Sequence, residues 1–328
     1  MKYMEPKVSI ILLNWNGAKI SFDCIKTLIK KTSYSNYNII FVDNGSHDDS
    51  VEVIQNNFPN VDIIKNKTNL GFPKGMNVGM RYAKDKYNPD YYLLLNNDLL
   101  FFEKKWLREL VFSFKNKKIG IANPVLLYPN KEIQRIGSKI KNDKDLIINS
   151  VTSIPEKINL EFRKKKLREI DLFLGACFLI KSDLIKEIGF LDERYSPYLI
   201  EDLEYSYRAK KAGYKIVTVT SSNVIHLFHE TFNTQIIINK KKDIQRVYVV
   251  LRNSFLFSLD YLGWIKSFFL TLPLLFFTCL FEKKDKSRGN SFFNFKLRKF
   301  PLNRIINFFK SIKDGIRLYF KRRDDFIR

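Results

Sequence analysis

The stretch Tyr91-Tyr92-Leu93-Leu94-Leu95-Asn96-Asn97-Asp98 decides the fold of this 328-residue chain. Its aromatic and aliphatic residues are typical of a buried β-strand, and the strand ends in two amides and one carboxylate. Because alternate side chains of a strand share a face, we expect Asn96 and Asp98 to point the same way and Asn97 the opposite way. Open parallel sheets bind ligands beyond the carboxyl ends of their strands, so this tip is a candidate site. Taken alone, it is more often an ordinary polar turn.

Similar apolar runs recur along the chain, each followed by polar residues and a helical pattern. The runs at residues 8–13 and 37–42 lead into Asn14 and Asp43. Further strands are expected at residues 61–65, 119–128, 173–180 and 214–220, and helices at 75–86, at 104–116 and from 182. This alternation predicts an α/β fold with a mostly parallel sheet and helices on both faces. Residues of about 130–170 lack clear periodicity, which predicts an insertion or a mobile loop.

The formal net charge of +23 is concentrated in a few segments. Residues 282–328 hold 15 Lys and Arg against 5 Asp and Glu, and a second basic cluster lies at residues 163–168. A nucleic-acid-binding protein would interleave basic and aromatic residues over its folded sheet, so this distribution argues against nucleic acid as the partner. The three cysteines are far apart and lie in apolar contexts, which predicts buried thiols in a reducing compartment without a disulfide or a Cys-based zinc site: Cys24, Cys177 and Cys279.

The C-terminal residues, 260–328, are expected to form a helical extension of a domain made by residues 1–259. The first residues show no signal-peptide pattern, and the longest uncharged apolar run, 267–281, is too short for a simple membrane span. Residues 302–320 place apolar side chains on one helical face and basic ones elsewhere, which predicts an amphipathic helix. We expect it to hold a cytoplasmic protein on the anionic inner face of the cell membrane. The alternative is packing against its own domain or a second subunit of a homo-oligomer.

Two further loops carry candidate binding residues. Asp43 is followed by Asn44-Gly45-Ser46, and a carboxylate there can accept hydrogen bonds from a base or a ribose, although the pattern is also common in turns. Ser46 with Asp49 predicts a capping box at the next helix. The loop at residues 69–79 has three glycines, which let the backbone approach a ligand, and two amides that can bind one. A glycine-punctuated turn is an equally good interpretation of that loop.

With these segments in place, the chain from about residue 8 to residue 259 resembles glycosyltransferase family 2, and especially its rhamnosyltransferase-like bacterial members. No single motif is specific to the family, but the order and spacing of the motifs together are specific. The motifs are residues 8–17, 42–48, 69–79, 93–98, 175–181 and 189–193, then Tyr198, Glu201-Asp202, Arg208, His226 and Arg252-Asn253. The resemblance implies a Rossmann-like GT-A fold. It also implies an inverting, metal-dependent hexosyltransferase of cell-surface polysaccharide synthesis that uses a nucleoside-diphosphate sugar.

The resemblance implies a role for each residue that matches the family. Asp98 takes the place of the last acid of the family's Asp-x-Asp element and would hold Mg²⁺ or Mn²⁺ together with His226. Asp43 would bind the base or ribose of a dTDP- or UDP-sugar. Asp202, with Glu201 beside it, would be the general base that deprotonates an acceptor hydroxyl. Further nucleotide-sugar contacts are expected from Asn14, Asn69, Gly71, Lys74, Asn77, Asn96 and Asn97.

The implied acceptor is a glycan or a lipid-linked oligosaccharide, and rhamnose is suggested as the sugar by the family likeness alone. The chain departs from the family in Pro73 and Met76, and in having Asn-Asn-Asp in place of two or three acids. The smaller number of acids bears on the expected metal affinity but not on the expected use of a metal. Arg208 has a structural interpretation as a helical partner of Glu204, and a role at the diphosphate is an equally good interpretation. The alternative enzyme is a nucleotidyltransferase that makes a sugar nucleotide, although residues 14–17 carry no basic phosphate-binding group. A nucleic-acid-binding protein is the alternative outside enzymes.

Overall fold

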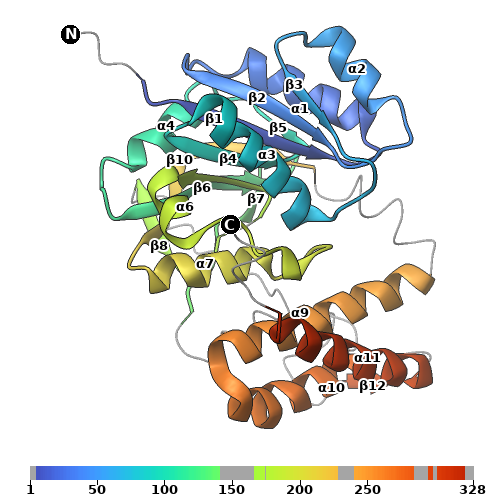
Figure 1. Ribbon diagram of the computed structural model, residues 1–328. Helices are drawn as coiled ribbons and strands as arrows, with labels where there is room; N and C mark the ends of the chain where they lie inside the picture. Colours follow the sequence, from blue (N-terminus) through green and yellow to red (C-terminus); the bar gives the residue numbers. More distant parts are fainter. Residues whose placement is uncertain are drawn as a thin grey trace. The chain divides into compact units, whose positions relative to one another are not determined.

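The structure is a computed structural model that describes residues 5–140, 166–173, 175–227, 240–283, 295–297 and 301–321. Contacts divide these residues into two compact units, the first holding residues 5–139 and 166–227, and the second starting at residue 240. One unit is built around a sheet and the other from helices (Figure 1). The sequence suggested a boundary at residue 259, which lies inside helix α9 (Lys240–Lys266), and the contacts of α9 place it in the second unit.

One half of the sheet is parallel, with the strand order β3-β2-β1-β4. Strand β1 lies between β2 and β4, and β3 forms the edge: β1 (Val8–Asn14), β2 (Tyr37–Asp43), β3 (Asp62–Lys65) and β4 (Tyr91–Asn96). The runs predicted from the sequence fall on these strands to within one residue at each end. Strands buried on both faces are continuous apolar runs, which is why the sequence located them well.

Beyond β4 the sheet is mixed. Strand β9 (Cys177–Lys181) runs antiparallel to β4 and to β6 (Ile119–Leu127), whereas β10 (Lys215–His226) pairs in parallel with β6. Three short strands pair antiparallel with their neighbours: β5 (Leu99–Leu100), β7 (Ile133–Arg135) and β8 (Leu167–Ile170). The α/β class is therefore confirmed, but the parallel arrangement is limited to the first four strands and the β6–β10 pair. An apolar run does not encode strand direction, so the sequence could not show that β9 is reversed.

Helices cover both faces of the sheet (Figure 1). One face packs against α1 (Ala18–Lys30), α2 (Ser50–Asn57) and α4 (Trp106–Ser113), and the other against α3 (Phe72–Tyr87), α6 (Ser182–Ile188) and α7 (Glu201–Lys211). Leu12 of β1 belongs to the first core and its neighbour Ile11 to the second, as strand alternation requires. All three cysteines are free and buried, as predicted.

Part of the region predicted as an insertion belongs to the sheet. Strands β7 and β8 lie at its two ends and pair with β6 and β10. They are three and four residues long and mix polar with apolar residues, so they are too short to show periodicity. Residues 141–165, the remainder of that prediction, lie outside the described part of the chain. Strand β10 also continues past the predicted end at 220 as far as His226.

The second unit is helical. After α9 come the π-helical turn η3 (Ser267–Thr271) and α10 (Leu272–Leu280), a small hairpin of β11 (Phe281–Lys283) and β12 (Phe295–Leu297), and α11 (Pro301–Tyr319). Phe308 and Ile312 of α11 pack with Phe255 of α9 and Leu275 of α10 in its core. Much of the apolar face predicted for residues 302–320 is therefore used inside this unit, which was the alternative interpretation.

One helical path in this unit, Gln245–Phe277, is long and apolar enough to cross a membrane by length and composition, with 22% of its most apolar window buried. This path is longer than the apolar run at residues 267–281, because it continues through the charged residue Lys266 into α9. The path is not one regular helix, since Gly263 has φ 79° and ψ 167°, outside the helical region.

Candidate active site

Polar residues that end neighbouring strands lie side by side at the carboxyl edge of the parallel strands. Asn14 of β1 is in register with Asp43 of β2, and β4 ends beside them in Asn96. His226 ends β10 where that strand pairs with β5, the short strand that directly follows Asp98. The topology thus brings five predicted site residues, distant in sequence, to one edge of the sheet.

Asn14 is the centre of a buried hydrogen-bond network. Its Nδ2 donates to Asp43 Oδ1 and to Ser46 Oγ, both at 3.1 Å. Its Oδ1 accepts from Asn97 Nδ2 at 3.0 Å and from Ser21 Oγ at 2.8 Å. The side chains of Asn14 and Asn97 are engaged here, and both residues are almost fully buried. We therefore assign them to positioning the strand ends, not to direct contact with a ligand.

Asp43 is held rigidly at the end of β2. In addition to the bond from Asn14, its Oδ2 accepts from the backbone N–H of Ser46 at 3.1 Å. Only 4% of the residue is exposed. A carboxylate oxygen has more than one acceptor site, so both oxygens can still accept a further hydrogen bond. The carboxylate is thus oriented in advance for a donor such as a ribose hydroxyl or a base N–H.

The capping box predicted for Ser46 and Asp49 is absent. The Ser46 hydroxyl instead accepts from the backbone N–H of Asn16 at 2.8 Å and from Asn14. The first turn of α2 is bound by Asp48, whose Oδ1 accepts from the backbone N–H of Ser50 at 3.2 Å. The network at the strand ends therefore takes the hydroxyl that the helix would have used.

The loop that follows β3 is tied to the end of β2 by amides. Asn44, 2% exposed, donates from Nδ2 to Asn69 Oδ1 at 3.0 Å and accepts from the backbone N–H of Leu70 at 3.1 Å. Asn69 Oδ1 also accepts from the N–H of Gly71 at 2.8 Å. Lys74 lies in the first turn of α3, and among the described residues its ammonium group has no ion-pair partner. A free cation at a helix start suits a phosphate.

Asn77 does not belong with the ligand-binding residues. It is fully buried, and its amide donates to Leu191 O at 2.8 Å and to Glu193 Oε1 at 3.1 Å while accepting from the N–H of Leu191 at 3.1 Å. Helical periodicity explains this difference, since a residue two turns into α3 faces the core of the protein. Asn77 fastens α3 to the segment before α7, so the nucleotide-binding role predicted for its side chain is not supported.

Asp98 and His226 face each other in a buried setting. His226 Nε2 lies 3.3 Å from Asp98 Oδ1, and that oxygen has no hydrogen-bond partner among the described residues. On the other side of the ring, His226 Nδ1 lies 2.7 Å from Gln134 Oε1, while Gln134 Nε2 donates to the backbone oxygen of His226 at 3.3 Å. Because an amide oxygen only accepts, Nδ1 carries the hydrogen, and the Nε2 of a neutral ring presents its lone pair toward Asp98.

Glu201 and Asp202 open α7 in a partly buried setting. Asp202 Oδ1 accepts from the N–H of Leu203 at 2.8 Å. Burial raises the pKa of Asp202, while the N–H groups of Leu203 and Gly175 and the charge of Arg135 act in the opposite direction. Burial, with the charge of Asp202 as the second cause, raises the pKa of Glu201 to about 8. An acid pair with raised pKa values is suited to accepting a proton near neutral pH.

The chain enters this acid pair through strained backbone. Leu199 and Ile200 both have positive φ, at 72° and 75°. Non-glycine residues in this region cost about 1–3 kcal/mol each and cluster at functional sites. The same segment packs on the loop that follows β3, because a Cβ at Gly71 would lie 2.5 Å from the Cα of Pro197. Gly71 also has φ 82°, so glycine is required there on two counts.

Strand β7 connects His226 to the acid pair. Gln134 contacts His226, and the adjacent Arg135 acts electrostatically on Asp202. Neither residue could be predicted from the sequence, because both lie in a strand of three residues within the region predicted to be an insertion. Arg208 is a structural residue as suggested: its guanidinium binds Glu204 at 2.7 Å and also the backbone oxygen of Phe190 at 2.8 Å.

The residues at this edge fit a hard divalent cation. Asp98 supplies a buried, orphaned carboxylate oxygen, and His226 a ring nitrogen fixed by a hydrogen bond behind it, an arrangement common for metal-binding histidines. Within the described ranges, no group of three or more His, Cys, Asp and Glu side chains could hold a metal ion by itself. Mg²⁺ is commonly bound by one or two protein ligands, with the remainder from water and substrate phosphates.

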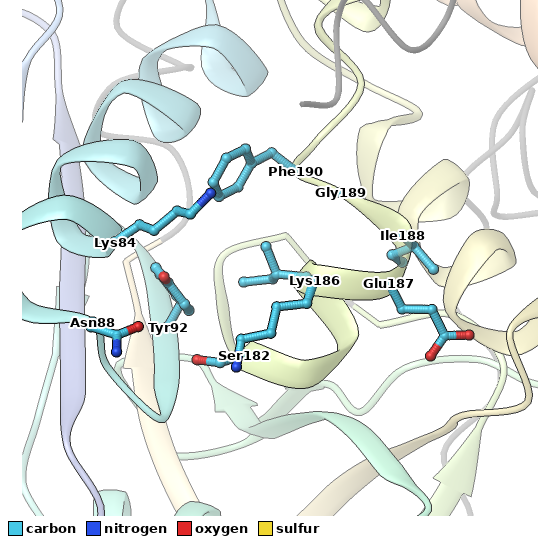
Figure 2. Close-up of a pocket in the computed structure, with 10 residues that line it drawn as sticks. Lys84, Asn88, Tyr92, Ser182, Lys186, Glu187, Ile188, Gly189 and Phe190 are labelled. Carbon is cyan, nitrogen blue, oxygen red and sulfur yellow. The ribbon is translucent and has the colours of Figure 1, made fainter.

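A separate cavity of about 460 Å³ opens at the opposite end of β4 (Figure 2). Tyr92, at the start of that strand, points its hydroxyl into it, and Lys84, Lys186 and Phe190 contribute to its walls. None of the predicted site residues lines it. The cavity is therefore separate from the acid and amide cluster at the carboxyl end of β4.

The comparisons with known proteins agree with this geometry. The sequence profile of Glycosyl transferase family 2 matches residues 9–189, more than half of the chain, so the chain belongs to this family. The structure resembles that of GalNAc-T7 with UDP, GalNAc and Mn²⁺, with a TM-score of 0.56, 16% identity and coverage of 78% of this chain. The chain spans 48% of that protein, and the likeness concerns the GT-A fold alone.

Two curated relatives are also similar. The chain is 26% identical over 255 residues to the low-salt glycan biosynthesis hexosyltransferase Agl10 of Haloferax volcanii, covering 78% of this chain and 76% of the relative. It is 24% identical over 213 residues to the N-acetylglucosaminyl-diphospho-decaprenol L-rhamnosyltransferase of Mycobacterium tuberculosis, covering 60% and 67%. The likeness to rhamnosyltransferase-like members that the sequence suggested is thereby confirmed, and the protein is a glycosyltransferase.

Proposed function

We propose that this glycosyltransferase transfers a hexose, such as rhamnose, from a dTDP- or UDP-sugar to a hydroxyl of a lipid-linked oligosaccharide or other glycan, with inversion at the anomeric carbon. The observation that supports the proposal most is that the carboxylate of Asp43 and the pair of Asp98 and His226 lie at one edge of the sheet. Strand β7 links this edge to the acid pair of Asp202 and Glu201, because Gln134 contacts His226 and the adjacent Arg135 acts on Asp202.

On the donor side, Asp43 would accept hydrogen bonds from the base or ribose. The backbone around Asn69 and Gly71 would lie along the nucleotide, and Lys74 would pair with a phosphate at the start of α3. Asn96 would contact the ribose or a water molecule near the cation, since among the described residues its side-chain amide has no hydrogen-bond partner. These contacts bind and orient the donor.

Asp98 and His226 would hold Mg²⁺ or Mn²⁺. A bound cation neutralises charge that develops on the diphosphate as the sugar departs. The contact between Gln134 Oε1 and Nδ1 orients the His226 ring so that its Nε2 faces Asp98, and both residues are buried. The loss of acids relative to the family is thus offset in part by preorganisation of the two ligands that this chain provides.

Asp202 would take the proton of the acceptor hydroxyl while that oxygen attacks the anomeric carbon from the face opposite the diphosphate. One displacement inverts the centre and needs a single base, with no covalent sugar intermediate. The N–H groups of Leu203 and Gly175 fix the carboxylate, and burial raises its pKa toward working pH. Glu201 would share the proton of the pair and tune the base.

The similarity to a decaprenol-linked rhamnosyltransferase supports a lipid-linked acceptor. We accordingly propose that the protein works in the cytoplasm at the inner face of the cell membrane, in synthesis of a cell-surface polysaccharide. The first unit would carry catalysis, and the helical unit that begins with α9 would form a membrane-associating extension.

The test is a panel of nucleotide sugars measured for thermal stabilisation with and without Mg²⁺ or Mn²⁺, since a ligand that binds only the folded state raises its melting temperature. The proposal expects one donor to stabilise more in the presence of metal and then to yield nucleoside diphosphate with an acceptor. A nucleotidyltransferase would instead release pyrophosphate from a nucleoside triphosphate and a sugar phosphate, and that product would refute the transferase mechanism.

A further inference from the structure

The second unit exposes a concentration of apolar side chains. Ten of the fifteen large hydrophobic residues that are exposed in the described part of the chain lie between residues 264 and 320. The most exposed are Ile265 at 78%, Phe269 at 76% and Phe320 at 72%. Isolated exposed hydrophobic residues are normal, whereas a contiguous group indicates contact with a partner or a membrane.

This group begins where α9 is interrupted. Gly263 leaves the helical region with φ 79°, nothing lies within 4 Å of where its side chain would be, and the chain then forms the turn η3. Trp264 stacks on Phe268, with ring centroids 5.6 Å apart and planes at 11°. Phe320 at the end of α11 lies 6.0 Å from the same Trp264 ring. The turn and the end of α11 therefore form one aromatic patch.

The exposed side of α11 combines apolar and basic residues. Ile306, Phe309 and Phe320 lie on it at 57–72% exposure, and the exposed basic residues Lys310, Lys313, Arg317 and Lys321 recur at helical spacing between and beside them. Asp314, the one acid of this helix, is hydrogen-bonded to the Tyr248 hydroxyl at 2.5 Å. Aromatic residues beside a row of cations are the composition of helices that lie in the interface of anionic membranes.

We propose that residues 264–270 and the exposed side of α11 form a membrane-docking surface for an anionic bilayer. Ile265, Phe269 and Phe309 enter the headgroup region, and Lys310, Lys313 and Arg317 bind lipid phosphates. This inference rests on the proposed function, since a lipid-linked acceptor requires an enzyme at the bilayer. It relocates the contact that the sequence suggested, because the apolar side of α11 is buried in its own unit at Phe308 and Ile312.

Two other uses of the surface fit the structure less well. A two-fold dimer through this face would oppose the same row of cations on both copies, which repel each other. A span through residues 245–277 would have to continue past the interruption at Gly263, and its first part is packed in the unit, since Phe255 of α9 contacts the core residues of α11. Docking of this surface on a bilayer requires neither the approach of like charges nor a helix that continues past Gly263.

The experiment is co-sedimentation of the full chain with vesicles of phosphatidylcholine alone or mixed with phosphatidylglycerol. The variant Ile265→Ser/Phe269→Ser removes two exposed side chains, and Ile29→Ser/Phe112→Ser removes the same residue types where they are exposed at 43% and 58% on the first unit. We expect the first variant to bind anionic vesicles at least about tenfold more weakly and the second to bind like the parent chain. Equal binding by both variants would overturn the proposal.

A second arm tests the charges. Lys310→Gln/Lys313→Gln/Arg317→Gln should lose most of the preference for phosphatidylglycerol, as should the parent chain in high salt, whereas Lys115→Gln/Lys117→Gln/Lys118→Gln should retain it. Release of the membrane-bound parent by carbonate supports docking, and release by detergent alone would replace it with a span. A lower mass of the Ile265/Phe269 variant in vesicle-free solution would show a dimer interface instead. None of these measurements uses donor or acceptor, so they fail or succeed independently of the proposed transfer reaction.

Discussion

Replacement of Asp202 by asparagine separates the proposed chemistry from the fold. Asparagine has the same size and keeps an oxygen that accepts from the N–H of Leu203, but its amide nitrogen would face the N–H of Gly175, a mismatch worth about 1 kcal/mol. The folded state should therefore persist with a slightly lower melting temperature. Loss of a general base typically reduces turnover by about 10²–10⁴-fold, which corresponds to about 2.7–5.4 kcal/mol of barrier.

The assay follows release of nucleoside diphosphate at saturating donor and acceptor, together with the KM for the donor. We expect kcat of the Asp202→Asn variant to fall within that range while the donor KM changes less than about threefold, because Asp202 is not on the nucleotide side. Asp183→Asn is the matched control, since this exposed acid opens α6 and pairs with Lys181. Turnover within threefold of the parent chain would remove Asp202 as the base and leave the fold assignment intact.

Four further outcomes follow from the geometry. Asp98→Asn should weaken Mn²⁺ binding by at least about tenfold, as measured by electron paramagnetic resonance with nucleoside diphosphate present. Gln134→Leu should weaken it by about 10–100-fold, and Gln134→Glu should recover part of the affinity because it keeps an acceptor for the His226 ring. Unchanged Mn²⁺ affinity in both Asp98→Asn and Gln134→Leu would exclude Asp98 and His226 as the metal ligands. Burial raises the pKa of Glu201 to about 8 from its ordinary value of 4.5, so the parent chain loses stability as pH rises between these two values. Glu201→Gln should therefore have a higher melting temperature than the parent at pH 8, and the difference should vanish by about pH 5. A difference in melting temperature that does not depend on pH would contradict this. Asn77→Ala leaves the N–H and the carbonyl of Leu191 without their hydrogen bonds to the Asn77 side chain. It should lower the free energy of unfolding, measured in urea, by about 2–3 kcal/mol and leave the donor KM unchanged. A raised donor KM in a variant of unchanged stability would show that Asn77 does bind the donor.

The part of the candidate site that is formed by strand ends could be predicted from the sequence. The runs that end in Asn14, Asp43 and Asn96 are buried on both faces, so hydrophobicity marks them clearly, and parallel pairing then brings their ends together. The placement of His226 beside Asp98 came from family resemblance, since a histidine at the end of a strand has no sequence signal of its own. Its contact with Asp98 arises from the antiparallel pairing of β10 with β5.

Other features depend on tertiary contacts that no local pattern encodes. Gln134 and Arg135 lie in a three-residue strand, and their partners are 92 and 67 positions away. Asn77 was expected at the nucleotide because it shares a loop motif with Asn69, but the rotation of α3 turns it into the core. The division of α11 into a buried apolar side and an exposed mixed side likewise appears only once α9 packs against it.

Crystals grown with Mn²⁺ and UDP or dTDP would show by anomalous scattering whether distant strand ends form one cation-assisted donor site. We expect one manganese peak within bonding distance of Asp98 and His226, with the nucleotide extending from it toward Asp43. Nucleotide bound at another edge of the sheet, or a manganese peak distant from both side chains, would contradict it.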